Sequence, residues 1–305
     1  MKDIKVSVIV SNYQGIEFLP KCLEHLMNQT YDNYEVLIVD AGSTDGSPEY
    51  IEKQFPKVKL IRCGRIGIGE AVNIGIKNST GQIICFDFNT DEFVEPDWIE
   101  ESIKHLEKYD YNIISGTTRL IDGTNLIDEA GLTLDFFLRS KKNGHGKEIG
   151  IFDIKDEPVD YVGSPMFHRK ILKRTGLIDE KYFIYAEDLD FCYRAKKKGI
   201  ETRCAPLAIS HHCVRGTIGK KNRRLEYFLR RANIRFQIKF ADTYNVYFGL
   251  LYLCVFLPFS AFIGAISGTR ESKVYYEKFM GRINAVWWNI KNLKKTLIER
   301  KNENN

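Results

Sequence analysis

The clearest strand signal in the chain is Val6-Ser7-Val8-Ile9-Val10-Ser11-Asn12-Tyr13, which reads VSVIVSNY. Its first five residues are mostly β-branched and apolar, as is typical of a strand buried on both faces of a parallel sheet. Similar apolar runs lie at 36–39, 58–61 and 83–88. Polar residues follow these runs directly, and open α/β sheets bind ligands at the carboxyl ends of their strands. These polar residues are therefore the first candidates for a functional site.

Segments with the apolar spacing of helices alternate with these strand runs. The segments expected to be helical are 18–27, a stretch starting at 47, 67–78, 96–109, 168–175 and 188–198. Repeated βαβ units of this kind predict an α/β domain with a mostly parallel sheet and helices on both faces. Between 113 and 162 the pattern loosens around several glycines, and we expect short strands and long loops there.

The composition is that of a folded protein, since 44% of the 305 residues are hydrophobic and 28% are charged. The seven cysteines include no Cys-x-x-Cys pair, which argues against a zinc ribbon and favours a reducing compartment. The charged start of the chain predicts no secretory signal peptide. Net charge is −7 over residues 1–200 and +12 over residues 201–305. This asymmetry favours an acidic, cation-binding part and a basic part that faces phosphates or a membrane.

The last third of the chain carries the basic and apolar extremes of the sequence. Residues 215–239 contain nine basic residues and one acidic residue, and residues 243–269 contain no charge. Apolar residues then recur at helical spacing over 279–297, with lysines between them. The sequence therefore divides into a first domain at 1–240 and a C-terminal helical region at 241–305.

The uncharged stretch 243–269 is a candidate for contact with a membrane. It is long enough for one crossing but not for two, and Pro258 interrupts it. Basic residues flank it on both sides, which disfavours a single crossing. We therefore expect a re-entrant or interfacial helical hairpin on the cytoplasmic face of the membrane. The alternative is a buried helix pair that packs on the first domain.

Two turns follow the second and third strand runs. Asp40 ends a strand and opens the turn 41–46, where its carboxylate can bind a ribose or a base edge. A plain turn closed by an aspartate explains the same residues equally well. The stretch 65–75 opens a helix with several glycines, whose amides can face a phosphate. Close packing of helix on sheet is the more common explanation for such glycines.

Acidic residues follow the fourth strand run and begin a later helix. Asp87, Asn89 and Asp91 offer the oxygen ligands that Mg²⁺ takes, although an acidic loop that caps the next helix also fits. Glu187, Asp188 and Asp190 crowd one helix start, which raises the pKa of one member and suits a general base. The alternative is a capped helix in which Asp190 pairs with Arg194.

Two adjacent histidines, His211 and His212, lie on a predicted strand. Neighbouring strand residues point to opposite faces, so at most one of the two serves a site. A metal held by the acidic loop would give that histidine a partner.

Taken in order, these motifs resemble those of the family 2 glycosyltransferases of GT-A fold, and most closely the rhamnosyltransferase-like branch. The matching stretches are 6–13, 39–46, 65–75, 89–91, 163–169 and 183–194. The resemblance covers about residues 4–240. It implies inverting transfer of a sugar from a nucleotide-diphospho-sugar to a glycan or lipid-linked acceptor, in the assembly of cell-surface polysaccharide or glycoprotein glycans. A membrane surface is the implied further partner, and nucleic acid is not expected.

The resemblance also implies roles for individual residues. Nucleotide-sugar contacts fall to Tyr13, Asp40, Arg65 and Asn89. Asp91 and His212 are the implied ligands of Mn²⁺ or Mg²⁺ bound to the diphosphate. The catalytic base falls to the pair Glu187 and Asp188, of which we favour Asp188. Departures from the family pattern are Ser11 in place of proline, Arg65 in place of asparagine, and Asn89 in place of aspartate.

Other classes fit the sequence less well. A nucleotidyltransferase would need a basic phosphate loop near the N-terminus, and residues 12–15 contain no lysine or arginine. A non-catalytic binding module would not need both Asp91 and Asp188. A nucleic-acid-binding tail would not need the apolar run between its basic segments, which suits a membrane surface better.

Overall fold

The computed structural model describes most of the chain, which forms two compact units. The described residues are 4–109, 112–121, 124–136, 138–213, 223–242, 251–266 and 272–304. Within these ranges, the side chains of 87–89, 252–253, 257, 260–261, 265, 272 and 304 lie outside the description. The first unit comprises residues 1–133, 141–181 and 187–217, and the second comprises residues 134–140, 182–186 and 218–305. The functional division of the chain at residue 240 stays a prediction.

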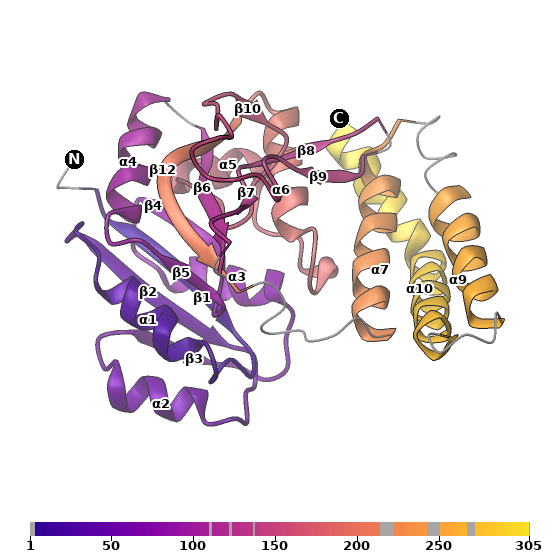
Figure 1. The fold of residues 1–305 in the computed structure, drawn as a ribbon, viewed down its shortest axis with the longest axis horizontal. Coiled ribbons are helices and arrows are strands. Elements are labelled where there is room, and N and C mark those ends of the chain that lie inside the picture. The colour runs from indigo at the N-terminus through magenta and orange to yellow at the C-terminus, as the bar shows by residue number, and fades with distance from the viewer. Residues whose placement is uncertain are drawn as a thin grey trace. The chain divides into compact units, whose positions relative to one another are not determined.

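A ten-stranded mixed sheet is the centre of the first unit (Figure 1). Its strands are β1 (Val6–Asn12), β2 (Tyr34–Asp40), β3 (Lys59–Arg62), β4 (Ile83–Asn89), β5 (Glu92–Val94), β6 (Ile113–Leu120), β7 (Ile127–Glu129), β10 (Pro158–Val159), β11 (Met166–His168) and β12 (Thr202–His212). Their order is β10-β12-β6-β11-β4-β1-β2-β3, while β5 pairs with β12 and β7 with β6. A small separate sheet is formed by β8 (Leu132–Leu134) and β9 (Ser140–Lys142).

The sheet is less parallel than the sequence predicts. β1 pairs in parallel with β2 and β4, and β2 pairs in parallel with β3, as expected of βαβ units. However, β11 runs antiparallel between β4 and β6, and β5, β7 and β10 also pair antiparallel. The prediction of a mostly parallel sheet is therefore corrected to a mixed sheet. Alternation of apolar and polar residues can locate a strand but does not show its direction of pairing, and β5, β7, β10 and β11 span only two or three residues.

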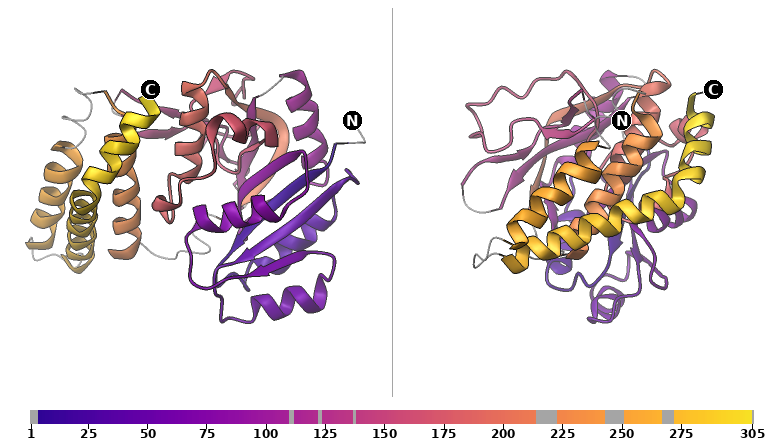
Figure 2. Two further views of the ribbon diagram at one scale, coloured as in Figure 1. Left: turned by 180° about the vertical axis from the view of Figure 1, so that it is seen from behind. Right: turned by 90° about the vertical axis from the view of Figure 1, so that its right-hand side faces the viewer.

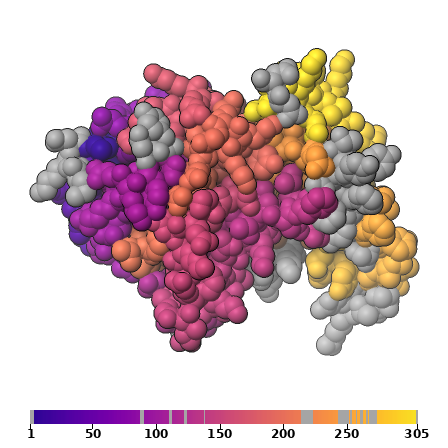
Figure 3. Space-filling model, turned by 90° about the horizontal axis from the view of Figure 1, so that it is seen from above, coloured from indigo at the N-terminus to yellow at the C-terminus, as the bar shows by residue number. Residues whose placement is uncertain are grey.

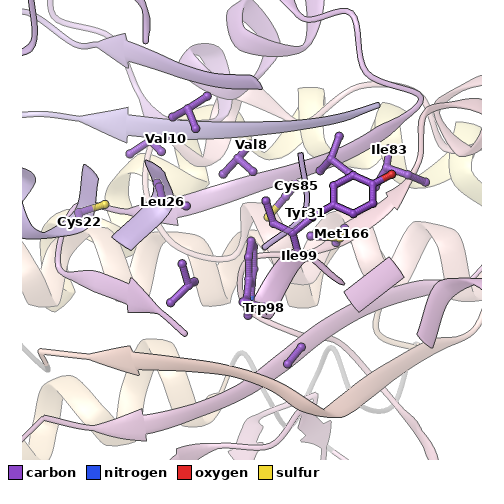
Figure 4. Packing of buried hydrophobic residues seen from close by; sticks show 14 of the residues in the cluster. Val8, Val10, Cys22, Leu26, Tyr31, Ile83, Cys85, Trp98, Ile99 and Met166 are labelled. Atoms are coloured by element: carbon purple, nitrogen blue, oxygen red, sulfur yellow. The ribbon is translucent and has the colours of Figure 1, made fainter. Parts of the chain in front are cut away.

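Helices cover both faces of this sheet, as predicted. Those of the first unit are α1 (Leu19–Met27), α2 (Ser47–Gln54), α3 (Ile68–Asn78), α4 (Trp98–Lys108), α5 (Leu172–Thr175) and α6 (Glu187–Lys197). Alternate residues of a strand point to opposite faces. On one face Val8 and Val10 of β1 join a buried cluster with Leu26 of α1 and Trp98 of α4 (Figure 4). On the other face Ile9 meets α3.

Close contacts of α3 explain two of the glycines in the stretch 65–75. A Cβ atom at Gly75 would come within 2.4 Å of the Ile9 side chain. One at Gly69 would lie 3.1 Å from the carbonyl oxygen of Asp179. Close packing of helix on sheet therefore accounts for Gly75, as the sequence pattern favours, whereas Gly69 packs on the loop at Asp179.

The described helices of the second unit are α7 (Arg223–Phe240), α9 (Leu257–Ile266) and α10 (Ser272–Asn304), with a π-helical turn at Tyr252–Phe256. α10 packs against both α7 and α9 (Figure 2). Arg235 of α7 donates a hydrogen bond of 2.9 Å to Thr296, and Asn289 donates one of 3.1 Å to the carbonyl of Arg231. The predicted helix 279–297 thus lies within α10.

No helix among the described residues has both the length and the apolar character needed to cross a membrane. The uncharged stretch 243–269 lies partly outside the description, at 243–250 and 267–269. Its described part is helical and exposes large apolar side chains, namely Val255, Phe256, Phe259, Phe262, Ile263 and Ile266. Membrane association of this region stays a prediction.

Candidate active site

Asp40 shapes the turn that follows β2. Its Oδ2 accepts hydrogen bonds from the backbone amides of Gly42 (3.1 Å) and Ser43 (2.9 Å), and its Oδ1 accepts one of 2.7 Å from Asn12 Nδ2. Asp40 and Asn12 are both buried. The explanation of Asp40 as a turn-closing aspartate is thus confirmed. Its contact with a nucleoside stays a prediction.

Tyr13 and Arg65 come together from the loops after β1 and β3. The guanidinium carbon of Arg65 lies 3.4 Å from the centroid of the Tyr13 ring, which is a stacked cation–π contact. A planar group of this kind can stack on a nucleobase. The binding of a nucleotide by these two residues stays a prediction.

Asp91 and His212 are brought together by strand pairing. β5 begins directly after Asp91 and pairs antiparallel with β12, placing Glu92 opposite His212. Asp91 Oδ1 lies 3.8 Å from His212 Nε2. The neighbouring His211 points the other way, with its Nε2 2.7 Å from Glu95. Of the two histidines, His212 is therefore the one at the candidate site.

The donor set of Asp91 and His212 fits a divalent cation. Adjacent ligands of an octahedral ion with ligand distances of about 2.1 Å lie about 3 Å apart, so Asp91 and His212 would need to approach each other by about 1 Å. Asp128 contacts His212 Nδ1, which leaves Nε2 to face Asp91. No group of three or more acidic, histidine or cysteine side chains close enough for a metal occurs within the described ranges. The side chain of Asn89 lies outside those ranges. Two protein ligands suit an ion that takes its others from a diphosphate and water.

Asp128 and Glu129 of β7 were not identified by sequence reasoning. Burial alone would raise the pKa of the Asp128 carboxyl, but hydrogen bonds from His212 and Lys142 lower it to about 2. Burial raises the pKa of Glu129 to about 7, and the nearby charge of Asp188 adds to this rise. Only the adjacency of two acids after Leu126 and Ile127 hints at them in the sequence.

Asp188 lies in the first turn of α6. The loss of water around its carboxyl raises its pKa to about 6, although its own helix amide at Leu189 donates a hydrogen bond of 2.7 Å. Its neighbour Glu187 is buried. Asp190 pairs with Arg194 at 2.6 Å in a buried contact, as the alternative explanation of this cluster predicts. Asp188 is therefore the acid in this turn best suited to accept a proton near neutral pH.

Solved structures with low sequence identity share this fold. The crystal structure of GalNAc-T7 with UDP, GalNAc and Mn²⁺ has a TM-score of 0.65 at 17% identity, over 95% of this chain and 57% of that one. Mannosyltransferase PcManGT from Pyrobaculum calidifontis, in complex with GDP-Man and Mn²⁺, has a TM-score of 0.55 at 17% identity, over 95% and 87%. These likenesses establish the GT-A type α/β fold.

Relatives at higher identity match a shorter part of the chain. Glycosyltransferase GlyA from Streptococcus pneumoniae is 35% identical over 118 residues, which are 37% of this chain and 17% of that protein. The chain covers 31% and 41% of the length of relatives from Bacillus subtilis and Nostoc. The sequence model described as glycosyl transferase family 2 matches residues 7–176, more than half of the chain. The rhamnosyltransferase-like branch stays a prediction. The chain belongs to glycosyl transferase family 2.

Proposed function

We propose that this protein is an inverting glycosyltransferase that moves a sugar from a nucleotide-diphospho-sugar to a hydroxyl of a glycan or lipid-linked acceptor. Its place would be in the assembly of cell-surface polysaccharide or glycoprotein glycans. The observation that carries the proposal is the approach of Asp91 to His212 Nε2, at 3.8 Å, from two distant parts of the sequence. The crystal structures of GalNAc-T7 and PcManGT, which hold a nucleotide and Mn²⁺, support it.

Different residues of the site bind the donor and hold the metal. Tyr13, Asp40, Arg65 and Asn89 bind the nucleotide part of the donor. Asp91 and His212 would hold Mn²⁺ or Mg²⁺, which when bound offsets the negative charge of the departing nucleoside diphosphate.

Asp188 is the proposed base, with Glu187 beside it in the same helical turn. It takes the proton of the acceptor hydroxyl, whose oxygen bonds to the anomeric carbon while the bond to the diphosphate oxygen breaks. Attack from the face opposite the leaving group inverts the configuration. The segment 117–160 is the proposed acceptor region, and its residues form part of the surface on the face drawn in Figure 3.

A donor screen tests this proposal. Purified protein is incubated with Mn²⁺ or Mg²⁺ and individual UDP-, GDP- and dTDP-sugars, and released nucleoside diphosphate is measured with and without saccharide acceptors. Turnover of at least one donor is expected. Pyrophosphate release from a nucleoside triphosphate and a sugar 1-phosphate, without any use of nucleotide sugars, would instead indicate a nucleotidyltransferase.

The raised pKa of Asp188 predicts the pH dependence of the transfer. The base must be ionised, so kcat should rise with pH through about 6 and level off above about pH 7. Glu129 titrates nearby with a pKa of about 7, so the two acids titrate as a pair and can broaden this limb. The measurement is kcat from pH 5 to 8 at saturating donor and metal. A kcat that stays constant from pH 5 to 7 would contradict the assignment of Asp188.

The proposed location is the cytoplasmic face of the cell membrane. α10 exposes Trp287 (58%), Ile290 (55%) and Leu297 (47%), and α9 exposes Phe259 (61%) and Ile266 (62%). Lysines lie among the exposed residues of α10, and Lys291 Nζ is 5.2 Å from the Trp287 ring. Apolar side chains interleaved with lysines suit the interface of a membrane that carries anionic lipids.

Vesicle sedimentation tests this location. The protein should pellet with vesicles of phosphatidylglycerol and phosphatidylethanolamine, and the variant Trp287→Ser/Ile290→Ser should pellet at least about fivefold less, because two apolar contacts are lost. The matched control is Leu207→Ser, which removes an equally exposed apolar side chain (67%) from β12. Equal pelleting of all three proteins would contradict a membrane role of α10.

A further inference from the structure

We propose that Asp128 is a positioning residue, which holds the His212 ring in the orientation and tautomer that present Nε2 to Asp91. The inference deepens the proposed function, on which its metal-binding consequence rests. Asp128 would not touch the donor or the metal, and it would act through the imidazole alone.

The geometry around His212 carries this inference. Asp128 Oδ2 lies 3.0 Å from His212 Nδ1, while His212 Nε2 lies 3.8 Å from Asp91 Oδ1. One ring nitrogen therefore faces each carboxylate. In a neutral imidazole the nitrogen that donates to a carboxylate carries the proton, and the other nitrogen keeps its lone pair for a metal.

Asp128 is itself firmly placed. Its side chain is 3% exposed, and its Oδ1 accepts a hydrogen bond of 2.7 Å from Lys142 Nζ. His145 Nδ1 is 2.9 Å from the backbone carbonyl oxygen of Asp128. The carboxylate thus has one oxygen bound by Lys142 and the other directed at His212.

Adjacent strands set the spacing of the two residues. β7, which carries Asp128, pairs with β6, and β6 pairs in parallel with β12, which ends at His212. Lys142 belongs to β9, within the proposed acceptor region. Asp128, which itself lies in the proposed acceptor region 117–160, therefore contacts both the proposed metal ligand His212 and Lys142 of that region.

A purely structural role for Asp128 predicts different behaviour from a role toward His212. If Asp128 only anchors Lys142, then Lys142→Met should have the same effect as Asp128→Asn. If Asp128 orients His212, then Lys142→Met should leave the imidazole contact and the metal affinity largely intact. The two variants thus form a matched pair that separates the two roles.

Two measurements on the full chain test the inference. Nitrogen-15 NMR of the histidine rings at alkaline pH should show His212 with its proton on Nδ1, and this tautomer should be lost or mixed in Asp128→Asn. Titration with Mn²⁺ alone, followed by the EPR signal of free Mn²⁺, should show about 10–100-fold weaker binding in Asp128→Asn and less than about threefold change in Lys142→Met. Adding Asp128→Asn to His212→Ala should cause no further loss.

The outcomes distinguish the role of Asp128 from the existence of the metal site. An Nε2–H tautomer in the unaltered protein, or an unchanged tautomer in Asp128→Asn, would overturn the inference. Equal losses of Mn²⁺ affinity in Asp128→Asn and Lys142→Met would do the same. If the unaltered protein binds no Mn²⁺ even when UDP or GDP is added, the proposed metal site fails, and the tautomer measurement still decides the role of Asp128. Melting temperatures of all variants identify any that fail to fold, and Asp128→Ala then takes the place of Asp128→Asn.

Discussion

Asp188→Asn should lower kcat by about 10²–10⁴-fold, the range that a general base contributes, while the affinity for the nucleotide-sugar donor stays within about threefold. The amide cannot take the acceptor proton, but its shape and its helical position are kept. The measurement is steady-state transfer, with donor affinity determined separately by calorimetry.

Glu187→Gln is the matched control for this substitution, because it makes the same chemical change one residue earlier in α6. It should cost far less turnover than Asp188→Asn. If Glu187→Gln is inactive while Asp188→Asn remains active, the base has been assigned to the wrong member of the pair.

Asp91→Ala should reduce transfer by at least about 10²–10³-fold and weaken donor binding, since the metal would lose its carboxylate ligand and the diphosphate its counter-charge. Excess EDTA should abolish the activity of the unaltered protein, and added Mn²⁺ or Mg²⁺ should restore it. Transfer rates and donor affinities with each metal are the measurements.

The control for Asp91→Ala is Glu95→Ala, which removes a nearby carboxylate that pairs with His211 rather than His212. Its turnover should stay within about twofold of the unaltered protein. Full transfer in the presence of excess EDTA would contradict a metal-dependent mechanism.

The fold was predictable wherever the chain repeats one pattern over several residues. The strands β1, β2, β3 and β4 and the helices α1, α3, α4 and α6 lie where the apolar spacing predicts them. β11 was not predictable as a strand, because three residues hold too few alternations to distinguish a strand from a loop, and alternation does not show the direction of pairing. The mixed character of the sheet therefore emerges only from long-range pairing.

The residues of the candidate site also differ in whether the sequence pattern predicts them. Asp91, Asp188 and the stacked pair of Tyr13 and Arg65 each adjoin a strand or helix end that the pattern reveals. Asp128 does not, because its role depends on the pairing of β7 with β6 and of β6 with β12, which no local pattern encodes. The choice between His211 and His212 likewise required the pairing of β5 with β12.

The buried pair of Asp190 and Arg194 constrains how this protein can vary among its relatives. Arg194 also donates hydrogen bonds to the carbonyls of Thr175 and Leu177, so it joins α6 to the end of α5. Removing one partner of such a pair leaves an uncompensated buried charge, at a cost of about 3–5 kcal/mol. Positions 190 and 194 should therefore be exchanged together over evolutionary time, whereas position 188 should stay unchanged if it carries the proposed base.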